Sequence, residues 1–169
     1  MGRRKIEKEK APHVTHRELC RIGAEWLFNH HLHMKLWKYV TVEMRSVAGE
    51  VPDIYGCCGF SSICIEVKTT HGDFVKDKNK YSRIHSERGC GNYRYYLCLK
   101  GVISIDELPD KWGLMEYNAE NKSIEIIKEA QEIDCSFRSD LIMMCSIMRR
   151  MKIKPQIFDF SNKNNDVTK

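Results

Sequence analysis

The chain has 169 residues, of which 42% are hydrophobic and 30% are charged, a balance typical of a soluble globular protein. No apolar stretch approaches the ~18 residues that a membrane helix requires, and no apolar segment follows the basic N-terminus. We therefore expect a cytoplasmic protein of one domain, with neither a membrane span nor a secretory signal.

The net charge of +5 is concentrated at the two ends of the chain. Residues 1–10 hold five basic and two acidic residues, and residues 152–169 hold four basic and two acidic ones. The segment between them is neutral overall, so the total charge is poor evidence for nucleic-acid binding. We predict a disordered basic arm at 1–12, a folded domain at 13–154 and a flexible tail at 155–169.

The first half of the domain is predicted to be one helix and a meander of three strands. Thr15 and Glu18 fit a capping box at the start of a helix over 15–30. Strands rich in β-branched and aromatic residues are expected at 39–44, 52–58 and 63–69, and their short connections favour antiparallel pairing.

The second half is predicted to contain a crossover, a hairpin and a last helix. A helix over 72–88, which Gly89 ends, leads to a strand at 93–99, and this order suggests some parallel pairing. A hairpin is expected from strands at 112–117 and 124–128. Ser136 or Ser139 should cap the last helix. One stripe of this helix is expected to pack in the core: Leu141, Met144, Cys145, Met148 and Met151.

Eight cysteines raise the question of disulfides or zinc. Without a signal peptide a disulfide scaffold is not expected, and the sequence holds no CxxC pair. The grouping that merits a check is Cys57 and Cys58 with Cys64 and Cys90. A zinc-stabilised interaction protein is therefore one alternative for this chain.

Asp53, Glu66 and Lys68 have the clearest potential for chemistry. Side chains alternate along a strand, so Glu66 and Lys68 share one face, and the apolar residues at 63, 65 and 67 form the other, which packs on a helix. If the second and third strands pair, Asp53 can approach Glu66. Two carboxylates, waters and a substrate phosphate satisfy Mg²⁺. The ion acidifies a water, and Lys68 orients that water or stabilises the developing charge. The alternative is an exposed cross-strand charge pattern.

A basic segment follows this motif. On the helix predicted over 72–88, Lys76, Lys80 and Arg83 stand at i, i+4 and i+7, and hence on one face. The alternative is a solvated helix face. Because the helix follows Lys68 directly, these side chains would flank the cleft and contact phosphates without reading sequence.

The pattern of Pro52-Asp53 and then Glu66-x-Lys68 resembles the PD-(D/E)xK restriction-endonuclease-like superfamily. The resemblance implies an α/β fold with a restriction-endonuclease-like core: a mixed β-sheet flanked by helices in the order αβββαβ, with a C-terminal hairpin and helix. It implies that Asp53 and Glu66 bind Mg²⁺ or Mn²⁺, with the backbone carbonyl of Val67 as a further ligand. It also implies that Lys68 assists the hydrolytic water. Many members add a glutamate from the first helix or strand, for which the candidates are Glu18, Glu25 and Glu43.

A narrower resemblance covers most of residues 15–117. The run EVKTTHGDF at 66–74 and the run DKNK at 77–80 look like small phage and bacterial nuclease-like proteins of the MmcB group. Thr70 stands where that group commonly has serine and keeps a hydroxyl, so it is a candidate nucleic-acid contact. His71 replaces an arginine, which removes a permanent cation from that position.

We therefore expect a metal-dependent nuclease acting on nucleic acid, DNA more than RNA, in phage biology, repair or defence. The alternative on the same fold is a binding module that is catalytically silent or is activated by a partner. Many such enzymes cleave both strands as dimers, so a homodimer is one expected assembly.

Overall fold

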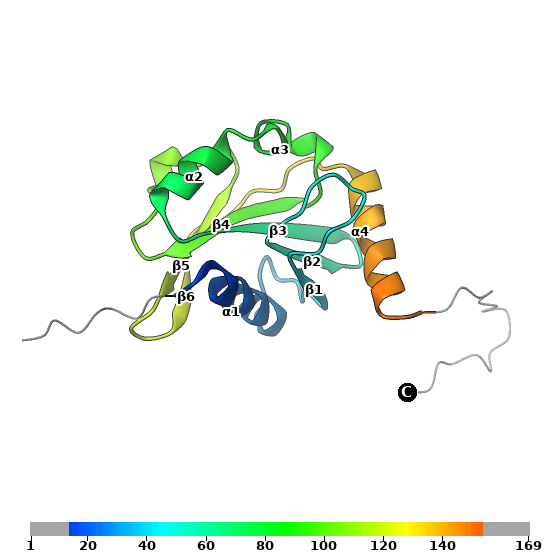
Figure 1. The fold of residues 1–169 in the computed structure, drawn as a ribbon, viewed down its shortest axis with the longest axis horizontal. Helices are drawn as coiled ribbons and strands as arrows, with labels where there is room; N and C mark the ends of the chain where they lie inside the picture. The colour runs from blue at the N-terminus through cyan, green and yellow to red at the C-terminus, as the bar shows by residue number, and fades with distance from the viewer. Residues whose placement is uncertain (1–13, 154–169) are drawn as a thin grey trace, which may run out of the picture.

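A computed structural model describes residues 14–153, so the arm predicted at 1–12 and the tail predicted at 155–169 lie outside the described residues. The structure is α/β, with a six-stranded mixed sheet flanked by helices (Figure 1). The strands are β1 (Tyr39–Val42), β2 (Ile54–Cys58), β3 (Ser61–Lys68), β4 (Tyr93–Leu99), β5 (Gly113–Asn118) and β6 (Ser123–Lys128). The helices are α1 (His16–Asn29), α2 (His71–Lys78), α3 (Tyr81–Ile84) and α4 (Phe137–Arg150), with short 3₁₀ turns η1 (Ser86–Arg88) and η2 (Ile105–Glu107).

The strands lie side by side in sequence order, from β1 to β6. The β1–β2 and β2–β3 pairs are antiparallel, which confirms the predicted meander, and β3 begins two residues earlier than expected. The β3–β4 pair is parallel, which confirms the predicted crossover, and β5–β6 is the predicted antiparallel hairpin. The β4–β5 pair is also parallel, which the sequence did not predict.

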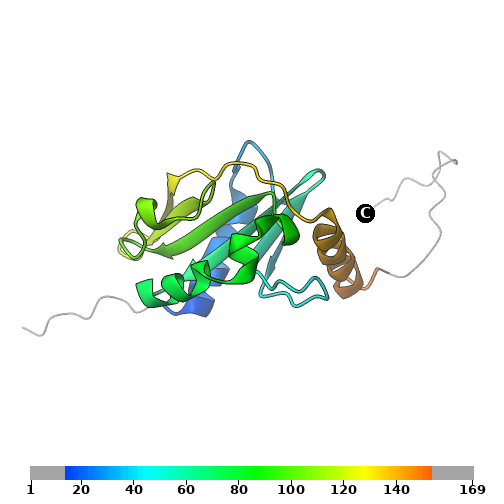
Figure 2. The same cartoon turned by 90° about the horizontal axis from the view of Figure 1, so that it is seen from above.

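Helix α1 covers one face of the sheet, and α2 and α3 cover the other (Figures 1 and 2). The α1 face of β3 presents Ile63, Ile65 and Val67 to a core cluster that includes residues of α1, as alternation predicts. A Cβ on Gly23 of α1 would lie 2.5 Å from Leu97 Cδ2, so glycine permits the close approach of this helix to the sheet. The sequence 63–68 therefore divides cleanly into an apolar face and a face that carries Glu66 and Lys68.

The predicted capping box at the start of α1 is confirmed. The backbone N–H of Thr15 donates to Glu18 Oε2 at 2.9 Å, and the backbone N–H of Glu18 donates to the Thr15 hydroxyl at 3.3 Å. We expect Thr15→Ala to lower the free energy of unfolding by about 1 kcal/mol, because it leaves helix N–H groups without that acceptor. Urea denaturation measures the loss. Thr15→Ser keeps the hydroxyl, and an equal loss in that variant contradicts the explanation.

The prediction of one helix over 72–88 is wrong. Helix α2 ends at Lys78, Lys80 has an extended backbone, and α3 is a separate turn that η1 follows. On a continuous helix Asp77 and Arg83 would point about 120° apart. Both are buried and joined by hydrogen bonds, so the break after Lys78 is what lets Arg83 turn inward.

The prediction that the methionine stripe of α4 packs in the core is also wrong. Helix α4 begins after the Ser136 cap and is buried through Ser139, Met143, Ser146 and Ile147. The predicted stripe is exposed instead: Leu141, Met144, Cys145, Met148 and Met151. Both sets have helical spacing, and the serines on the buried side let the helix lie close to the adjoining chain, as shown by the Ser139 hydroxyl near the Arg88 carbonyl at 3.5 Å.

No helix within residues 14–153 combines the length and the apolar character that a membrane span requires.

Candidate active site

The register of the β2–β3 pair brings Asp53 and Glu66 together. Ile54 pairs with Ile65, so the next position outward sets Asp53 opposite Glu66. The Asp53 carboxylate turns back over the strand end and accepts a hydrogen bond from the backbone N–H of Val67 at 2.8 Å. The predicted approach of the two carboxylates is therefore a direct result of the meander.

Lys68 lies at the centre of this group. Its Nζ is 3.6 Å from Asp53 Oδ2, 3.5 Å from Glu66 Oε2 and 3.5 Å from Asp77 Oδ1. The Lys68 side chain is 8% exposed, so this is a buried ammonium group among three carboxylates rather than an exposed charge pattern. Its position is where a cation shared by Asp53 and Glu66 is electrostatically favoured.

Arg83 completes the cluster from α3. Its Nη2 lies 2.7 Å from Glu66 Oε2, its Nε donates to Asp77 Oδ2 at 2.9 Å, and its Nη1 contacts Glu50 Oε1. Glu50 is also held by Arg94, with Nη2 to Oε2 at 2.9 Å. From the surface, Lys80 contacts the same group: its Nζ lies 2.6 Å from Asp77 Oδ1.

Four carboxylates and four cations thus form one network in which the charges balance. The carboxylates are Asp53, Glu66, Asp77 and Glu50, and the cations are Lys68, Arg83, Lys80 and Arg94.

Burial raises the pKa of a carboxyl group and ion pairing lowers it, and the balance differs between Glu66 and Asp77. Burial raises the pKa of Glu66 to about 7, although the charge of Arg83 opposes the rise, and the charge of Asp53 adds to it. Burial would also raise the pKa of Asp77, but hydrogen bonds and charge from Arg83 outweigh it, and the pKa of Asp77 is lowered. Asp77 is therefore the ionised anchor of the network, and Glu66 is the group poised to change its protonation near neutral pH.

One oxygen of this cluster has no hydrogen-bond partner among the described residues. Glu66 Oε1 is buried and unpaired, while Oε2 of the same carboxylate contacts both Arg83 and Lys68. A buried polar atom without a partner is costly and calls for an explanation such as a bound ion or water. An all-oxygen donor set from Asp53 and Glu66 fits a hard divalent cation.

The three candidate supporting acids differ in position. Glu18 serves the capping box of α1. Glu25 is exposed, and no contact of its side chain with the cluster is found within residues 14–153. Glu43 is the one near the site: its N–H donates to the Asp53 carbonyl at 2.9 Å, and its carboxylate is 4.0 Å from His16 Nδ1. Its φ of 46° is strained for a glutamate, as is common near functional sites.

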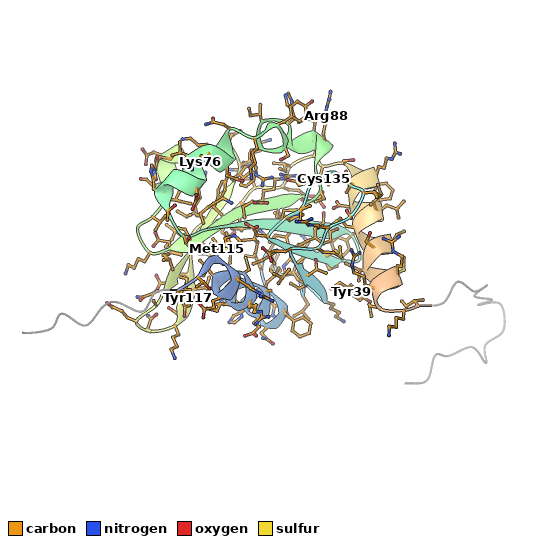
Figure 3. The ribbon with its side chains drawn as sticks, in the orientation of Figure 1. Tyr39, Lys76, Arg88, Met115, Tyr117 and Cys135 are labelled. Atoms are coloured by element: carbon orange, nitrogen blue, oxygen red, sulfur yellow. The ribbon has the colours of Figure 1, made fainter. Side chains whose placement is uncertain are left out.

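The four predicted nucleic-acid contacts do not form one face. Lys76 is exposed on α2 at the outer side of the helical layer (Figure 3). Lys80 is exposed but bound to Asp77, and the Thr70 hydroxyl caps α2 by accepting from the Asp73 N–H at 3.2 Å. Arg83 is buried, so the expectation that it shares a surface with Lys76 and Lys80 is wrong.

Sequence reasoning missed several members of the site. Asp77 lies in the DKNK run, whose charged and polar neighbours suggest an exposed residue. In the structure Asp77 is buried and accepts a hydrogen bond from the Tyr96 hydroxyl at 3.1 Å. Glu50 and Arg94 carry no local signal at all. His16 and Cys20 had a weak one, since residues four apart share a helix face. Of the four cysteines considered for zinc, Cys64 and Cys90 lie with their Sγ atoms 3.4 Å apart, but no three of them form a metal-ligand group. Within residues 14–153 the group found is His16, Cys20 and Asp53.

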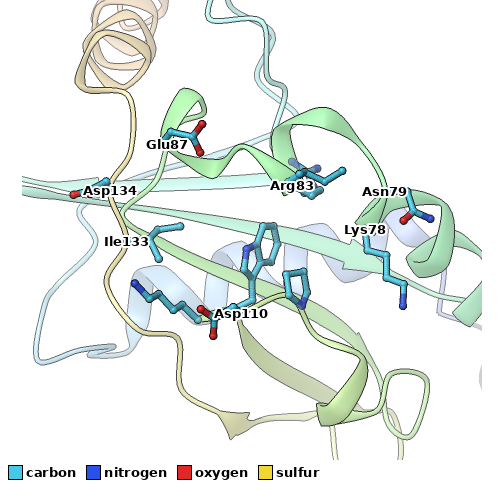
Figure 4. Close-up of a pocket in the computed structure, with 11 residues that line it drawn as sticks. Lys78, Asn79, Arg83, Glu87, Asp110, Ile133 and Asp134 are labelled. Carbon is cyan, nitrogen blue, oxygen red and sulfur yellow. The ribbon is translucent and has the colours of Figure 1, made fainter.

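A hollow of about 570 Å³ lies on another side of Arg83 (Figure 4). It is lined by the α2–α3 segment, by residues 109–112 and by Ile133 and Asp134. Asp53, Glu66 and Lys68 do not line it, although Arg83 does, and its lining carries both signs of charge. The hollow therefore adjoins the carboxylate cluster through Arg83, but the three predicted catalytic residues do not line it.

Comparison with known proteins gives a fold likeness. No family model matches the chain, and no curated protein matches it. A solved structure, the SPO1766 protein of unknown function from Silicibacter pomeroyi, is similar with a TM-score of 0.59. The two share 18% identity over 86% of this chain and 99% of that one. At this identity the likeness concerns the fold alone.

Proposed function

We propose that this protein is a metal-dependent nuclease that hydrolyses phosphodiester bonds, with a restriction-endonuclease-like core of the PD-(D/E)xK type. The observation that carries the proposal is the convergence of Asp53, Glu66 and Lys68, with one buried Glu66 oxygen left unpaired. Most buried oxygens in proteins are paired, and the other unpaired atom of this network, Arg94 Nε, is a donor that a cation does not satisfy. The unpaired oxygen favours a site that receives a cation.

In this proposal Asp53, Glu66 and the Val67 carbonyl hold Mg²⁺ or Mn²⁺. The bound ion would acidify a water and screen the charge of the phosphate. Lys68 orients the attacking water and stabilises negative charge that develops on the phosphate oxygens. Asp77 and Arg83 act as positioning residues, because Asp77 holds the Lys68 ammonium and Arg83 holds one Glu66 oxygen.

The substrate proposed is nucleic acid, with DNA preferred. Lys76 is exposed on α2, Lys80 is exposed at the start of α3, and Thr70 is the N-cap of α2. These side chains are suited to phosphate contacts that position the strand without reading its sequence. A homodimer remains part of the proposal, and the exposed apolar stripe of α4 is compatible with one.

A second candidate is a binding module of the same fold that is silent or activated by a partner. The observation favouring it is that the network is already neutral: Lys68 contacts three carboxylates, and Arg83 contacts Glu66. A cation that enters must compete with both side chains. A partner or substrate that moves Lys80 or Arg83 would then be the trigger for activity.

A cleavage assay with Mg²⁺ and Mn²⁺ on duplex DNA, single-stranded DNA and RNA tests these candidates. We expect cleavage by the parent protein and a loss of at least about 100-fold in Asp53→Asn and in Lys68→Ala, since each removes a charge at the reacting centre. Lys100→Ala, an exposed lysine after β4, is the matched control and should keep full activity.

The binding of the same substrates separates the two candidates. A folded parent protein that binds DNA but leaves every substrate intact in both metals favours the silent or partner-activated module. A parent that neither binds nor cleaves nucleic acid contradicts both. Circular dichroism of each variant confirms that lost cleavage does not reflect lost folding.

A further inference from the structure

A second group of metal-binding side chains lies on the α1 side of Asp53. His16 and Cys20 are four residues apart on α1, and both face the chain that enters β2. His16 Nε2 is 3.4 Å from Asp53 Oδ2, and Cys20 Sγ is 3.6 Å from His16 Nδ1 and 3.9 Å from His16 Nε2. One ligand atom from each residue lies within 4.8 Å of the others.

We propose that His16, Cys20 and Asp53 bind a divalent transition metal ion of the zinc class. A thiolate, an imidazole and a carboxylate are a donor set that suits Zn²⁺ or Co²⁺, whereas Mg²⁺ takes oxygen ligands. The donor set therefore distinguishes this ion from the Mg²⁺ or Mn²⁺ expected between Asp53 and Glu66.

The spacing of the ligand atoms matches a tetrahedral ion. With zinc bond lengths of about 2.3 Å to sulfur and about 2.0–2.2 Å to nitrogen and oxygen, neighbouring ligand atoms lie about 3.4 Å (N to O) and about 3.6 Å (S to N) apart. The corresponding distances here, with Nε2 as the His16 ligand, are 3.4 Å and 3.9 Å. The third edge, from Cys20 Sγ to the Asp53 carboxylate, is no longer than 4.8 Å, so the Cys20 side chain closes the triangle by moving at most about 1 Å toward Asp53.

The surroundings both attract and oppose a cation, and they leave it a way in. Cys20 is fully buried beside the carboxylates of Asp53 and Glu43, whereas the Lys68 ammonium lies 3.6 Å from Asp53 Oδ2 and has to give way to an entering ion. As the metal–sulfur bond forms, the thiol proton leaves to solvent. The His16 side chain is 41% exposed and that of Glu43 is 52% exposed, which leaves access for the ion and room for a water as fourth ligand. The Glu43 carboxylate lies 4.0 Å from Nδ1, the His16 ring nitrogen that does not bind the ion.

This site shares Asp53 with the proposed function but rests on its own donor set. Glu66 and Lys68 lie on the sheet face that α2 and α3 cover, while Cys20 belongs to the core cluster under α1. Asp53 stands at the strand end between the two. Each proposal can therefore fail without the other.

Titration of the full chain with Co²⁺ tests the inference. We expect one equivalent to produce the charge-transfer absorption of a cobalt–thiolate bond, and Zn²⁺ to displace it. Cys20→Ser should abolish the band. Cys98→Ser is the matched control and should keep it, because Cys98 is also fully buried, with a thiol pKa raised by burial to about 12. His16→Gln, at a partly exposed residue, should weaken Co²⁺ affinity at least about 10-fold without unfolding the protein.

Two results overturn the inference: no thiolate band from the parent protein at excess Co²⁺, or a band that persists in Cys20→Ser. If Cys20→Ser does not fold, His16→Gln is the deciding variant. An unchanged Co²⁺ affinity in His16→Gln also overturns the inference. Cleavage assays on the same samples separate the two proposals. Mg²⁺-dependent cleavage without a thiolate band removes this site and keeps the nuclease, and a thiolate band without cleavage under any metal does the reverse.

Discussion

Replacing Arg83 with methionine is expected to lower the free energy of unfolding by about 3–5 kcal/mol, the cost typical of removing one partner from a buried ion pair. The Arg83 guanidinium contacts Glu66, Asp77 and Glu50, and its side chain is only 4% exposed. Methionine fills a similar volume without charge, so the loss reports the carboxylates left unpaired rather than a cavity. Urea denaturation at neutral pH measures it.

Arg88→Met is the matched control. Arg88 lies five residues later on η1, its side chain is 69% exposed, and the substitution should change stability by no more than about 0.5 kcal/mol. The double variant Arg83→Met with Glu66→Gln should lose less than the sum of the single variants, because one unpaired charge is removed. If Arg83→Met lowers the free energy of unfolding by less than about 1 kcal/mol, Arg83 does not hold the buried carboxylates together as proposed.

The fold was predictable where local pattern and packing agree. The capping box, the helical spacing of α1 and the alternation in β3 each point to the element observed. The break between α2 and α3 was not predictable in this way. Residues 72–88 have no proline, and the C-cap of α2 is Asn79, whose side chain donates to the Val75 carbonyl at 3.0 Å. The break there lets Arg83 turn inward toward Glu66 and Glu50, and these contacts are contained in no local pattern.

The same distinction holds for the site. Asp53, Glu66 and Lys68 follow from strand pairing, because the turn at 59–60 fixes the register. The remaining charges come from distant parts of the chain, and Glu50 and Arg94 pair across 44 residues of sequence. Arg94 in a strand resembles an exposed position, yet it is 1% exposed. A sequence pattern indicates which charges exist, and only the folded sheet determines which of them are buried together.

For helix α4 the sequence predicts the helix but not which of its faces is buried. Its sequence offers two faces at helical spacing, one rich in methionine and one containing Ser139 and Ser146. Hydrophobicity alone selects the methionine face. The structure buries the other, because small side chains permit close packing and Met143 and Ile147 supply enough apolar contact.

Stability should fall with rising pH across the window set by Glu66. Burial raises the pKa of Glu66 from 4.5 to about 7, so between these values the folded protein keeps a proton that the unfolded chain has released. The unfolded state then binds fewer protons, and the free energy of unfolding decreases as pH rises. The contribution of this group amounts to roughly 3 kcal/mol over the window. Below pH 4.5 both states hold the proton, and above pH 7 both have released it.

Glu66→Gln isolates this effect, because glutamine stays neutral at every pH and keeps the shape of the side chain. We expect the difference in free energy of unfolding, parent minus variant, to fall between pH 4.5 and 7 and to be constant below and above that range. Denaturation at a series of pH values gives the curve, with Glu125→Gln on the exposed side of β6 as the control that should follow the parent. A saturating divalent cation should shift the descent to lower pH, because the ion stabilises the ionised carboxylate. A flat difference curve means that Arg83 and Lys68 already hold Glu66 fully ionised, and it would leave no proton for an entering ion to displace.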